Sequence, residues 1–396
     1  MKREREAGFA ETRGVVVRNN RAAPVLSTGQ SVLLWAALAI PSCEPISWGW
    51  PGTLGYLVIS ALGVWVGLRW LVPITWKLIP NERVGSAFLV ITLVLVFVAI
   101  ALVYPHAASR LPHHGSDNAE ALILGARSLF HGQYPYYQLT YLGNLLTPTP
   151  GAFILAAPFV VLHAVQYQSI LWLAVACAAA VKAWGSSKRV LVALWLTLAV
   201  SPALWRLLVT GTDFATTGIM LAVLTLVTAK LASGARLTWA TAGASILLGL
   251  AATSRLHLLI ILLPLAVYLR DACGMRRALA VCGTTLMTAA LVTLPWWAYD
   301  PSHFTPAHSF PPTSLPDAKT VLIMVTLLSA VVGATLLARR GLAGLSLACA
   351  VPLVTSALLT FVFGQATSAA FCYWGSFFVL FAAWYPPGTG NGALVR

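Results

Sequence analysis

Long apolar stretches, separated by short polar connectors, occupy most of this 396-residue chain and constrain its fold more than any other feature. Stretches of about 17–25 apolar residues are long enough to cross the hydrocarbon core of a bilayer as helices. Strands of a membrane barrel would alternate apolar and polar residues, which these continuous runs do not. We therefore predict an all-α, polytopic integral membrane protein with about 11–13 transmembrane helices, a few of them short enough to be half-spans or hairpins. The apolar stretches lie at residues 31–48, 51–70, 84–104, 148–163, 167–183, 188–204, 213–232, 237–254, 256–270, 277–297, 319–337, 342–362 and 367–385.

Charge is scarce in this chain, and its distribution predicts a topology. Only 9% of the residues are charged whereas 59% are hydrophobic, which is too little charge to cover a soluble protein of this size. The net charge of +14 does not indicate a nucleic-acid partner, because no soluble domain is present to carry a basic face. The basic residues lie in short connectors, as the positive-inside rule predicts for the cytoplasmic side of the plasma membrane. The connectors that we place inside contain Arg69, Lys77, Arg83, Lys188, Arg189, Lys230, Arg236, Arg270, Arg276, Arg277, Arg339 and Arg340.

The two ends of the chain differ from the apolar middle. Residues 1–29 carry acids as well as bases and contain no cleavable apolar core, which predicts a disordered basic cytoplasmic tail rather than a signal peptide. We expect residues 30–386 to form a single transmembrane catalytic domain and residues 387–396 to form a second short cytoplasmic tail. The six cysteines are scattered, mostly inside apolar runs, and lack the spacing of metal ligands, so they read as core residues.

This topology delivers several connectors to the outer side. Those are residues 105–147, 205–212, 253–256, 298–318 and 363–366. Segments 148–163 and 167–183 cannot both cross completely if Lys188 and Arg189 are inside. One of the two segments is then a half-span, or the connector that follows them is external.

Residues 105–150 form the longest polar interruption of the chain. They hold Asp117, Glu120, Arg127, His113, His114 and a run of tyrosines. Within this segment, residues 119–133 have apolar positions at helical spacing and polar residues between them, which predicts an amphipathic helix lying in the outer interface. Either Asp117 or Asn118 could cap that helix, so capping is a competing explanation for Asp117.

Other ionisable residues also fall on the predicted outer side. They are Arg110, Arg206, Arg255, Lys319, Asp213, Asp300 and Asp317, with Glu44 as a further candidate. Charges near the bilayer are costly unless they are paired or functional, so their gathering on one side favours a site over separate headgroup anchors. His303 and His308 lie five residues apart in a Pro-rich loop, but no third and fourth ligand has convincing spacing, so we expect no metal.

This order of an outer loop with an acidic residue, an interfacial helix and a Pro-rich segment resembles a known family, the GT-C superfamily of membrane glycosyltransferases. It is most similar to bacterial members that use polyprenyl-phosphate sugars, such as actinobacterial mannosyl- and arabinosyltransferases of the cell envelope. The matching pieces are Ser116-Asp117, the helix 119–130, Gly132-Gln133-Tyr134-Pro135-Tyr136, Pro148 with Pro150, and Gly249-Leu250-Ala251-Ala252-Thr253-Ser254-Arg255. The layout resembles the family over residues 84–300, although each short motif alone is weak. The chain departs from the family's frequent aromatic-Pro-Pro and Gly-Gln elements at residues 147–150 and 211–213.

The resemblance implies an all-α GT-C-like fold and a catalytic base at Asp117. An inverting transfer needs one carboxylate to take a proton from the acceptor hydroxyl while the anomeric carbon is attacked. The leaving lipid phosphate needs positive charge, for which Arg255, at the end of a Gly/Ala-rich helix, is the main candidate and Arg206 the second. His303 and His308 are further candidates for donor binding. We expect the substrates also to contact Glu120, Arg127, Tyr134, Tyr136 and Asp213.

The expected reaction moves a sugar, mannose or arabinofuranose, from a polyprenyl phosphate to an extracytoplasmic glycan or glycolipid acceptor, with no cofactor. The expected partners are these two substrates and the lipid bilayer. Arg255 also has a simpler explanation, in which its side chain extends to lipid headgroups. A membrane transporter or a flippase for lipid-linked sugars is the main alternative function, although such proteins usually carry ionisable residues near the bilayer midplane and internal repeats.

Overall fold

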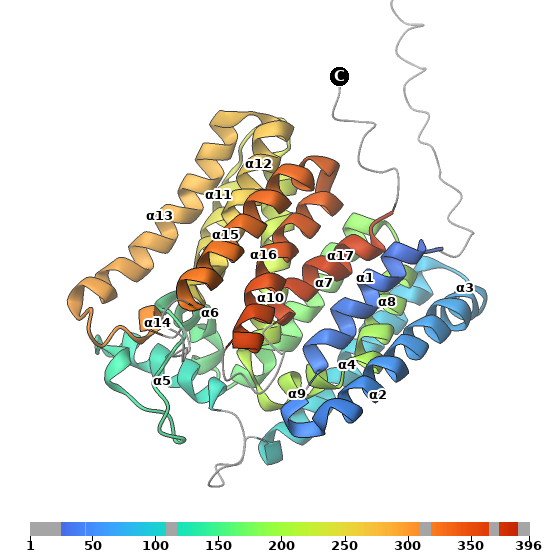
Figure 1. The fold of residues 1–396 in the computed structure, drawn as a ribbon, viewed down its shortest axis with the longest axis horizontal. Helices are drawn as coiled ribbons and strands as arrows, with labels where there is room; N and C mark the ends of the chain where they lie inside the picture. The colour runs from blue at the N-terminus through green and yellow to red at the C-terminus, as the bar shows by residue number, and fades with distance from the viewer. Residues whose placement is uncertain (1–24, 44, 108–116, 309–317, 364–371, 387–396) are drawn as a thin grey trace, which may run out of the picture.

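The computed structural model describes residues 25–43, 45–107, 117–308, 318–363 and 372–386 (Figure 1). The predicted tails at residues 1–29 and 387–396 fall outside this part of the chain, except for residues 25–29. Glu44, Arg110, His113, His114 and Asp317 also lie outside it. The described residues form an all-α protein, as predicted, and contain no named strand, only an isolated bridge between Leu139 and Leu145.

The helices follow one another with short connections. They are α1 (Thr28–Ala39), α2 (Pro45–Val66), α3 (Val72–Leu78), α4 (Glu82–Ala107), α5 (Asn118–Phe130), α6 (Pro150–Val161), α7 (Gln168–Trp184), α8 (Ser187–Val200), α9 (Pro202–Thr210), α10 (Asp213–Ala232), α11 (Trp239–Ala252), α12 (Leu262–Cys273), α13 (Met275–Tyr299), α14 (Thr305–His308), α15 (Ala318–Leu336), α16 (Gly341–Phe363) and α17 (Tyr373–Trp384).

The helices confirm a polytopic membrane protein. Within the described residues, 7 helical ranges are long and apolar enough to cross a membrane, and the number is 8 if the bent pair α8–α9 counts as one span. One of these ranges, Ile323–Leu359, takes in parts of both α15 and α16, which pack against each other. Helices α6, α11 and α17 are apolar but shorter. The apolar stretches read from the sequence therefore correspond to helices, although several do not reach spanning length alone.

The basic connectors gather at one end of the helices, which we call the basic end. The carboxylate of Glu82, at the start of α4, accepts hydrogen bonds from Ser186 and Ser187 at the start of α8. The Lys188 ammonium donates to the carbonyl of Ile79 at 2.9 Å. The guanidinium of Arg277 donates to carbonyls of the connector after α10, and Arg339 pairs with Asp271 at 3.0 Å. These contacts join the connectors in two groups, one before α4 and α8 and the other before α11, α13 and α16, and each group contains basic residues that the sequence placed together.

The opposite end carries the longest polar loops, and we call it the polar-loop end. Helices α5, α6, α9 and α14 lie together there, at the lower end of the bundle in Figure 1. Helix α8 reaches this end and bends by 90° into α9. Pro202 begins α9 because proline has no backbone N–H to donate and is well suited to the first helical turn. The bend directs the chain along this end before α10 returns toward the basic end.

Of the alternatives that the sequence left open, the structure fits a half-span at segment 148–163. Helix α6 has 12 residues, or about 18 Å, which is shorter than the roughly 30 Å hydrocarbon core. Its N-terminus lies beside the end of α11, where the Thr149 amide donates to the Ser254 carbonyl at 3.4 Å. The short helix η4 (Val165–Tyr167) that follows α6 contacts α5 and α9, so α6 starts and finishes near the same end. Helix α7 then crosses to the basic end.

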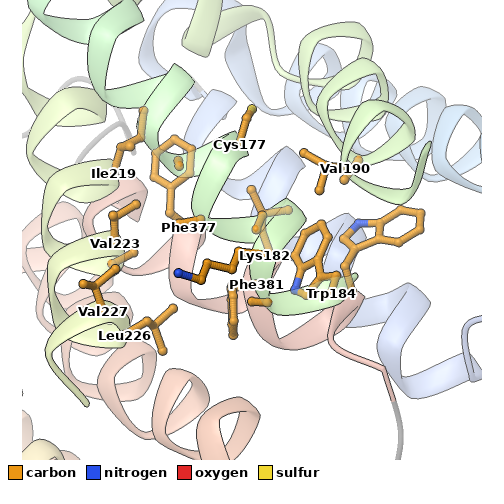
Figure 2. A pocket seen from close by; sticks show the side chains of 18 of the residues that line it. Cys177, Lys182, Trp184, Val190, Ile219, Val223, Leu226, Val227, Phe377 and Phe381 are labelled. Atoms are coloured by element: carbon orange, nitrogen blue, oxygen red, sulfur yellow. The ribbon is translucent and has the colours of Figure 1, made fainter. Parts of the chain in front are cut away.

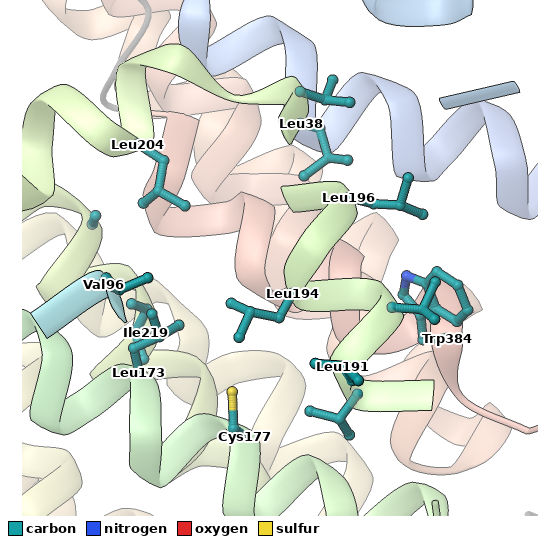
Figure 3. Close-up of a cluster of buried hydrophobic side chains, with 14 of the residues drawn as sticks. Leu38, Val96, Leu173, Cys177, Leu191, Leu194, Leu196, Leu204, Ile219 and Trp384 are labelled. Atoms are coloured by element: carbon teal, nitrogen blue, oxygen red, sulfur yellow. The ribbon is translucent and has the colours of Figure 1, made fainter. Parts of the chain in front are cut away.

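A large buried cluster joins α1, α4, α7, α8, α10 and α17 into the membrane-embedded core. Figure 3 shows Leu38, Leu194, Leu204, Ile219 and other members of this cluster converging between the helices. Helix α10 is the most enclosed of the spanning ranges, since 78% of its apolar window is buried, against 17% for α4. Asp213, the first residue of this enclosed central helix, therefore has a fixed position at the polar-loop end.

Candidate functional site

A buried ion pair lies at the polar-loop end. The Arg255 guanidinium is 3.3 Å from Oδ2 of Asp213, and the two side chains are only 9% and 6% exposed. Arg255 also donates to the Thr147 hydroxyl at 2.7 Å and lies over the ring of Phe214, 5.9 Å from its centre. Within the described residues, Oδ1 of Asp213 has no hydrogen-bond partner. A buried charge pair is costly to desolvate, so its retention near the membrane surface favours a functional role.

The chain positions Asp213 through a sharp turn between α9 and α10. Gly211 ends α9 with a φ of +68°, a left-handed conformation that glycine adopts without strain. Thr212 is the N-cap of α10, and Asp213 is the first residue of the helix, where the positive end of the helix dipole stabilises a carboxylate. A Cβ on Gly211 would lie 3.4 Å from the Ala119 side chain of α5. The turn that presents Asp213 therefore packs directly against the start of α5.

Arg255 is positioned by close packing of small residues at the end of α11. A Cβ on Gly249 would lie 2.6 Å from the Thr285 carbonyl of α13. A Cβ on Gly151 of α6 would lie 2.5 Å from the Leu250 carbonyl. Because glycine lets the backbones of α6, α11 and α13 approach this closely, the end of α11 is fixed between its neighbours.

Replacing Gly249 with Ala should destabilise the protein by about 1–3 kcal/mol, because the new methyl group meets backbone atoms that cannot rotate away. Gly243, also in α11, is the matched control, because a Cβ there has no atom within 4 Å. Gly243→Ala should be neutral or stabilising by up to about 1 kcal/mol. Free energies of unfolding for both variants in detergent would test this prediction, and equal values would contradict the packing argument.

Asp117 is held by a second set of side chains. Its Oδ2 accepts a hydrogen bond from the Thr140 hydroxyl at 2.7 Å and another from the Asn144 amide at 2.8 Å. Asp117 precedes α5, but its side chain makes no capping hydrogen bond to the helix. Capping therefore does not account for the Asp117 carboxylate. The side chain is half-buried. Its carboxylate is thus oriented by the loop that follows α5 rather than by the helix itself.

One loop connects the carboxylate of Asp117 to the guanidinium of Arg255. Thr140 and Asn144 of this loop donate to Asp117, and Thr147 accepts from Arg255. Asn144 and Thr147 are three residues apart, so their Cα atoms are separated by at most about 11 Å. Both groups therefore belong to the same end of the molecule, as the sequence analysis expected.

The remaining sequence candidates on α5 and α9 differ in their surroundings. Oε2 of Glu120 accepts from the Tyr141 amide at 2.7 Å, which ties the same loop to α5. Arg127 and Arg206 are exposed. The structure thus brings Glu120 to the loop of Asp117, and it places the two arginines on the surface.

Tyr134 and Tyr136 lie in a buried aromatic cluster, 8% and 1% exposed. The Tyr134 hydroxyl donates to the Asp300 carbonyl, and the Tyr136 hydroxyl donates to the Pro148 carbonyl. Burial, with the Asp300 carboxylate nearby, raises the pKa of Tyr134 to about 12. Burial also raises the pKa of Tyr136 well above its ordinary value. Both residues therefore stay protonated and join neighbouring loops.

The loop after α13 contains an acid–histidine pair that the sequence analysis did not assemble. Oδ2 of Asp300 accepts from the Tyr137 hydroxyl at 2.8 Å and lies 2.7 Å from Nδ1 of His303, whose side chain is 61% exposed. Hydrogen bonds from Ser302 and Tyr137 lower the pKa of Asp300 well below its usual value. The sequence signal was Asp-Pro-Ser-His, in which an Asp can bond to the backbone of its own turn. The backbone of His308 lies in α14.

This arrangement offers a carboxylate that can accept a proton and a cation that can bind a phosphate. Thr140, Asn144 and Thr147, which position these groups, were missed because their partners are distant in the sequence. No group of three or more His, Cys, Asp or Glu residues that could hold a metal occurs in the described part of the chain. Two cavities of that part, one between α7, α8, α10 and α17 and one beside α1 and α2, are lined by other residues than Asp117, Asp213 and Arg255.

Comparisons of the chain with protein-family models, with curated proteins and with solved structures found no match. The resemblance to GT-C glycosyltransferases is therefore carried by the short motifs named above.

Proposed function

We propose that this protein is a GT-C type glycosyltransferase that transfers a sugar, mannose or arabinofuranose, from a polyprenyl phosphate to a glycan or glycolipid acceptor outside the cytoplasmic membrane. The observation that carries this proposal is the loop of residues 138–149, which contacts both Asp117 and Arg255. A base for the acceptor and a cation for the donor phosphate are the two groups that such a transfer needs most.

In the proposed reaction, Asp117 takes the proton from the acceptor hydroxyl as its oxygen attacks the anomeric carbon of the sugar. The bond between that carbon and the phosphate oxygen breaks, and the electron pair leaves with the polyprenyl phosphate. Attack from the opposite face inverts the anomeric centre. Because phosphate is already a good leaving group, the site needs no general acid.

Arg255 is proposed to bind the donor phosphate by exchanging its partner. Without donor, its guanidinium is satisfied by Asp213 and Thr147. A phosphate offers more negative charge and more acceptor oxygens than the single carboxylate oxygen that Arg255 now contacts. Asp213 would then act as a placeholder that keeps the guanidinium paired until the lipid arrives.

A transporter or flippase is the alternative function. Such proteins usually place ionisable residues near the bilayer midplane on broken helices. Here the buried pair lies at helix ends, with Asp213 in the first turn of α10 and Arg255 after the last turn of α11. This position at a membrane surface is better suited to chemistry on a lipid headgroup than to passage of a solute.

The direct test is to incubate purified protein with polyprenyl-phosphate mannose and, separately, with polyprenyl-phosphate arabinose, and to measure released polyprenyl phosphate. We expect release to depend on protein and to rise with an added acceptor. A parallel assay in sealed vesicles would follow movement of the labelled lipid across the bilayer. Movement without any release from either donor would support the flippase and contradict the glycosyltransferase.

A further inference from the structure

An apolar cavity of about 300 Å³ lies away from the candidate site, between α7, α8, α10 and α17 (Figure 2). Its walls include Leu173, Leu194, Ile219, Val223 and Phe377. The lining extends along α7 from Leu173 to Trp184, a distance of about 16 Å, and ends at the basic end. The volume corresponds to roughly ten water molecules, but apolar walls of this kind do not hold water favourably.

The charged groups that line this cavity lie at its basic end. Lys182 and Lys230 line it near the ends of α7 and α10, and both are exposed. Figure 2 shows the Lys182 side chain reaching from α7 toward Val223 and Val227 of α10. None of the residues that line the cavity is an Asp or Glu. The mouth of the cavity therefore carries the positive charge of two lysines and no acidic residue among its described lining.

Two tryptophans form part of the wall at the basic end of the cavity. Trp184 and Trp384 end α7 and α17, line the cavity, and are 9% and 1% exposed. Among the described residues, neither indole nitrogen has a hydrogen-bond partner. A buried N–H donor without an acceptor costs free energy, and tryptophan usually finds a partner when it is buried. Because both indole nitrogens are buried within the protein, the two tryptophans contribute their apolar rings, which close the basic end of the cavity.

We propose that this cavity binds one acyl chain of an anionic membrane phospholipid, with the lipid phosphate at Lys182 and Lys230. The chain would fill the apolar walls from Leu173 to Phe377. The phosphate oxygens would accept hydrogen bonds from the ammonium groups of Lys182 and Lys230. This site lies at the end opposite Arg255 and Asp117, so it is separate from the proposed donor site and does not depend on glycosyl transfer.

The test is native mass spectrometry of the delipidated full-length protein, titrated with phosphatidylglycerol or with phosphatidylcholine of the same acyl chains. We expect one phosphatidylglycerol to bind more tightly than phosphatidylcholine. The double variant Lys182→Gln/Lys230→Gln should weaken the first phosphatidylglycerol by about 30-fold, because each surface lysine contributes about 1 kcal/mol to anionic lipid binding. Since both lysines are exposed, this variant should fold normally.

The matched control is Arg236→Gln/Arg276→Gln, which removes the same charge from other connectors of the basic end. An equal loss of affinity in this control would overturn the proposal, because it would show attraction to the whole basic surface. A second variant, Ala193→Phe, fills the cavity while keeping both lysines, and Ala193 is only half-buried. If Ala193→Phe melts as the wild type does and still binds phosphatidylglycerol with unchanged affinity, no chain enters the cavity and the proposal is wrong.

Discussion

Replacing Asp117 with Asn should lower the rate of sugar transfer by about 10²–10⁴-fold, because the amide cannot take the acceptor proton. The substitution keeps the shape of the side chain, and the amide oxygen of Asn can still accept from Thr140. We therefore expect the melting temperature to remain close to that of the wild type. The measurement is released polyprenyl phosphate per protein, with saturating donor and acceptor.

The control for this prediction is Asp271→Asn, which also removes one carboxylate but at the basic end, where Asp271 contacts Arg270 and Arg339. It should leave transfer unchanged. Wild-type activity in Asp117→Asn would show that another group is the base. His303 would then be the residue to examine, because the Asp300 carboxylate orients its ring from Nδ1.

Replacing Arg255 with Gln should destabilise the protein by about 3–5 kcal/mol, because it leaves the Asp213 carboxylate buried without a cation. The double variant Asp213→Asn/Arg255→Gln removes both charges and should recover most of that loss. Both variants should lack transfer, since neither can hold the donor phosphate. The measurements are the free energy of unfolding in detergent and the rate of transfer, which together form a double-mutant cycle.

Arg270→Gln provides the comparison with an exposed pair. Arg270 and Asp271 are 40% and 33% exposed, so loss of their contact should cost at most about 1 kcal/mol. If the double variant at Asp213 and Arg255 proves as unstable as Arg255→Gln alone, the uncompensated carboxylate is not the cause. Recovery of transfer along with stability would contradict the role of Arg255 in donor binding.

The sequence was sufficient to predict the architecture because membrane solvation acts on every residue of a span. Continuous apolar runs predicted the helices, and the basic connectors predicted which helix ends meet. The half-span α6 shows the limit of this information. Its apolar run has the composition of a spanning helix. The contact of its start with the end of α11, and those of the following η4 with α5 and α9, show that it starts and finishes near one end of the bundle.

The site was predictable in part, for a different physical reason. Asp117 and Arg255 stood out because ionisable residues are rare near spans, whereas their partners are ordinary polar residues in a loop. Tyr134 and Tyr136 show why residue type alone is insufficient. Both are common in sugar sites, but each donates its hydroxyl to a backbone carbonyl, and the partner of Tyr134 is 166 residues away. Only tertiary packing decides whether a tyrosine hydroxyl contacts a sugar or donates to a backbone carbonyl.

The loop of residues 138–149 contacts both parts of the candidate site, Asp117 and Arg255. Thr140 and Asn144, in the middle of the loop, donate hydrogen bonds to the carboxylate of Asp117. Thr147, near its end, accepts a hydrogen bond from Arg255. A ligand that draws the guanidinium away from Thr147 would remove one contact of the same short segment that orients the carboxylate. Occupancy at one substrate position would thereby change the affinity at the other, by the same factor in both directions.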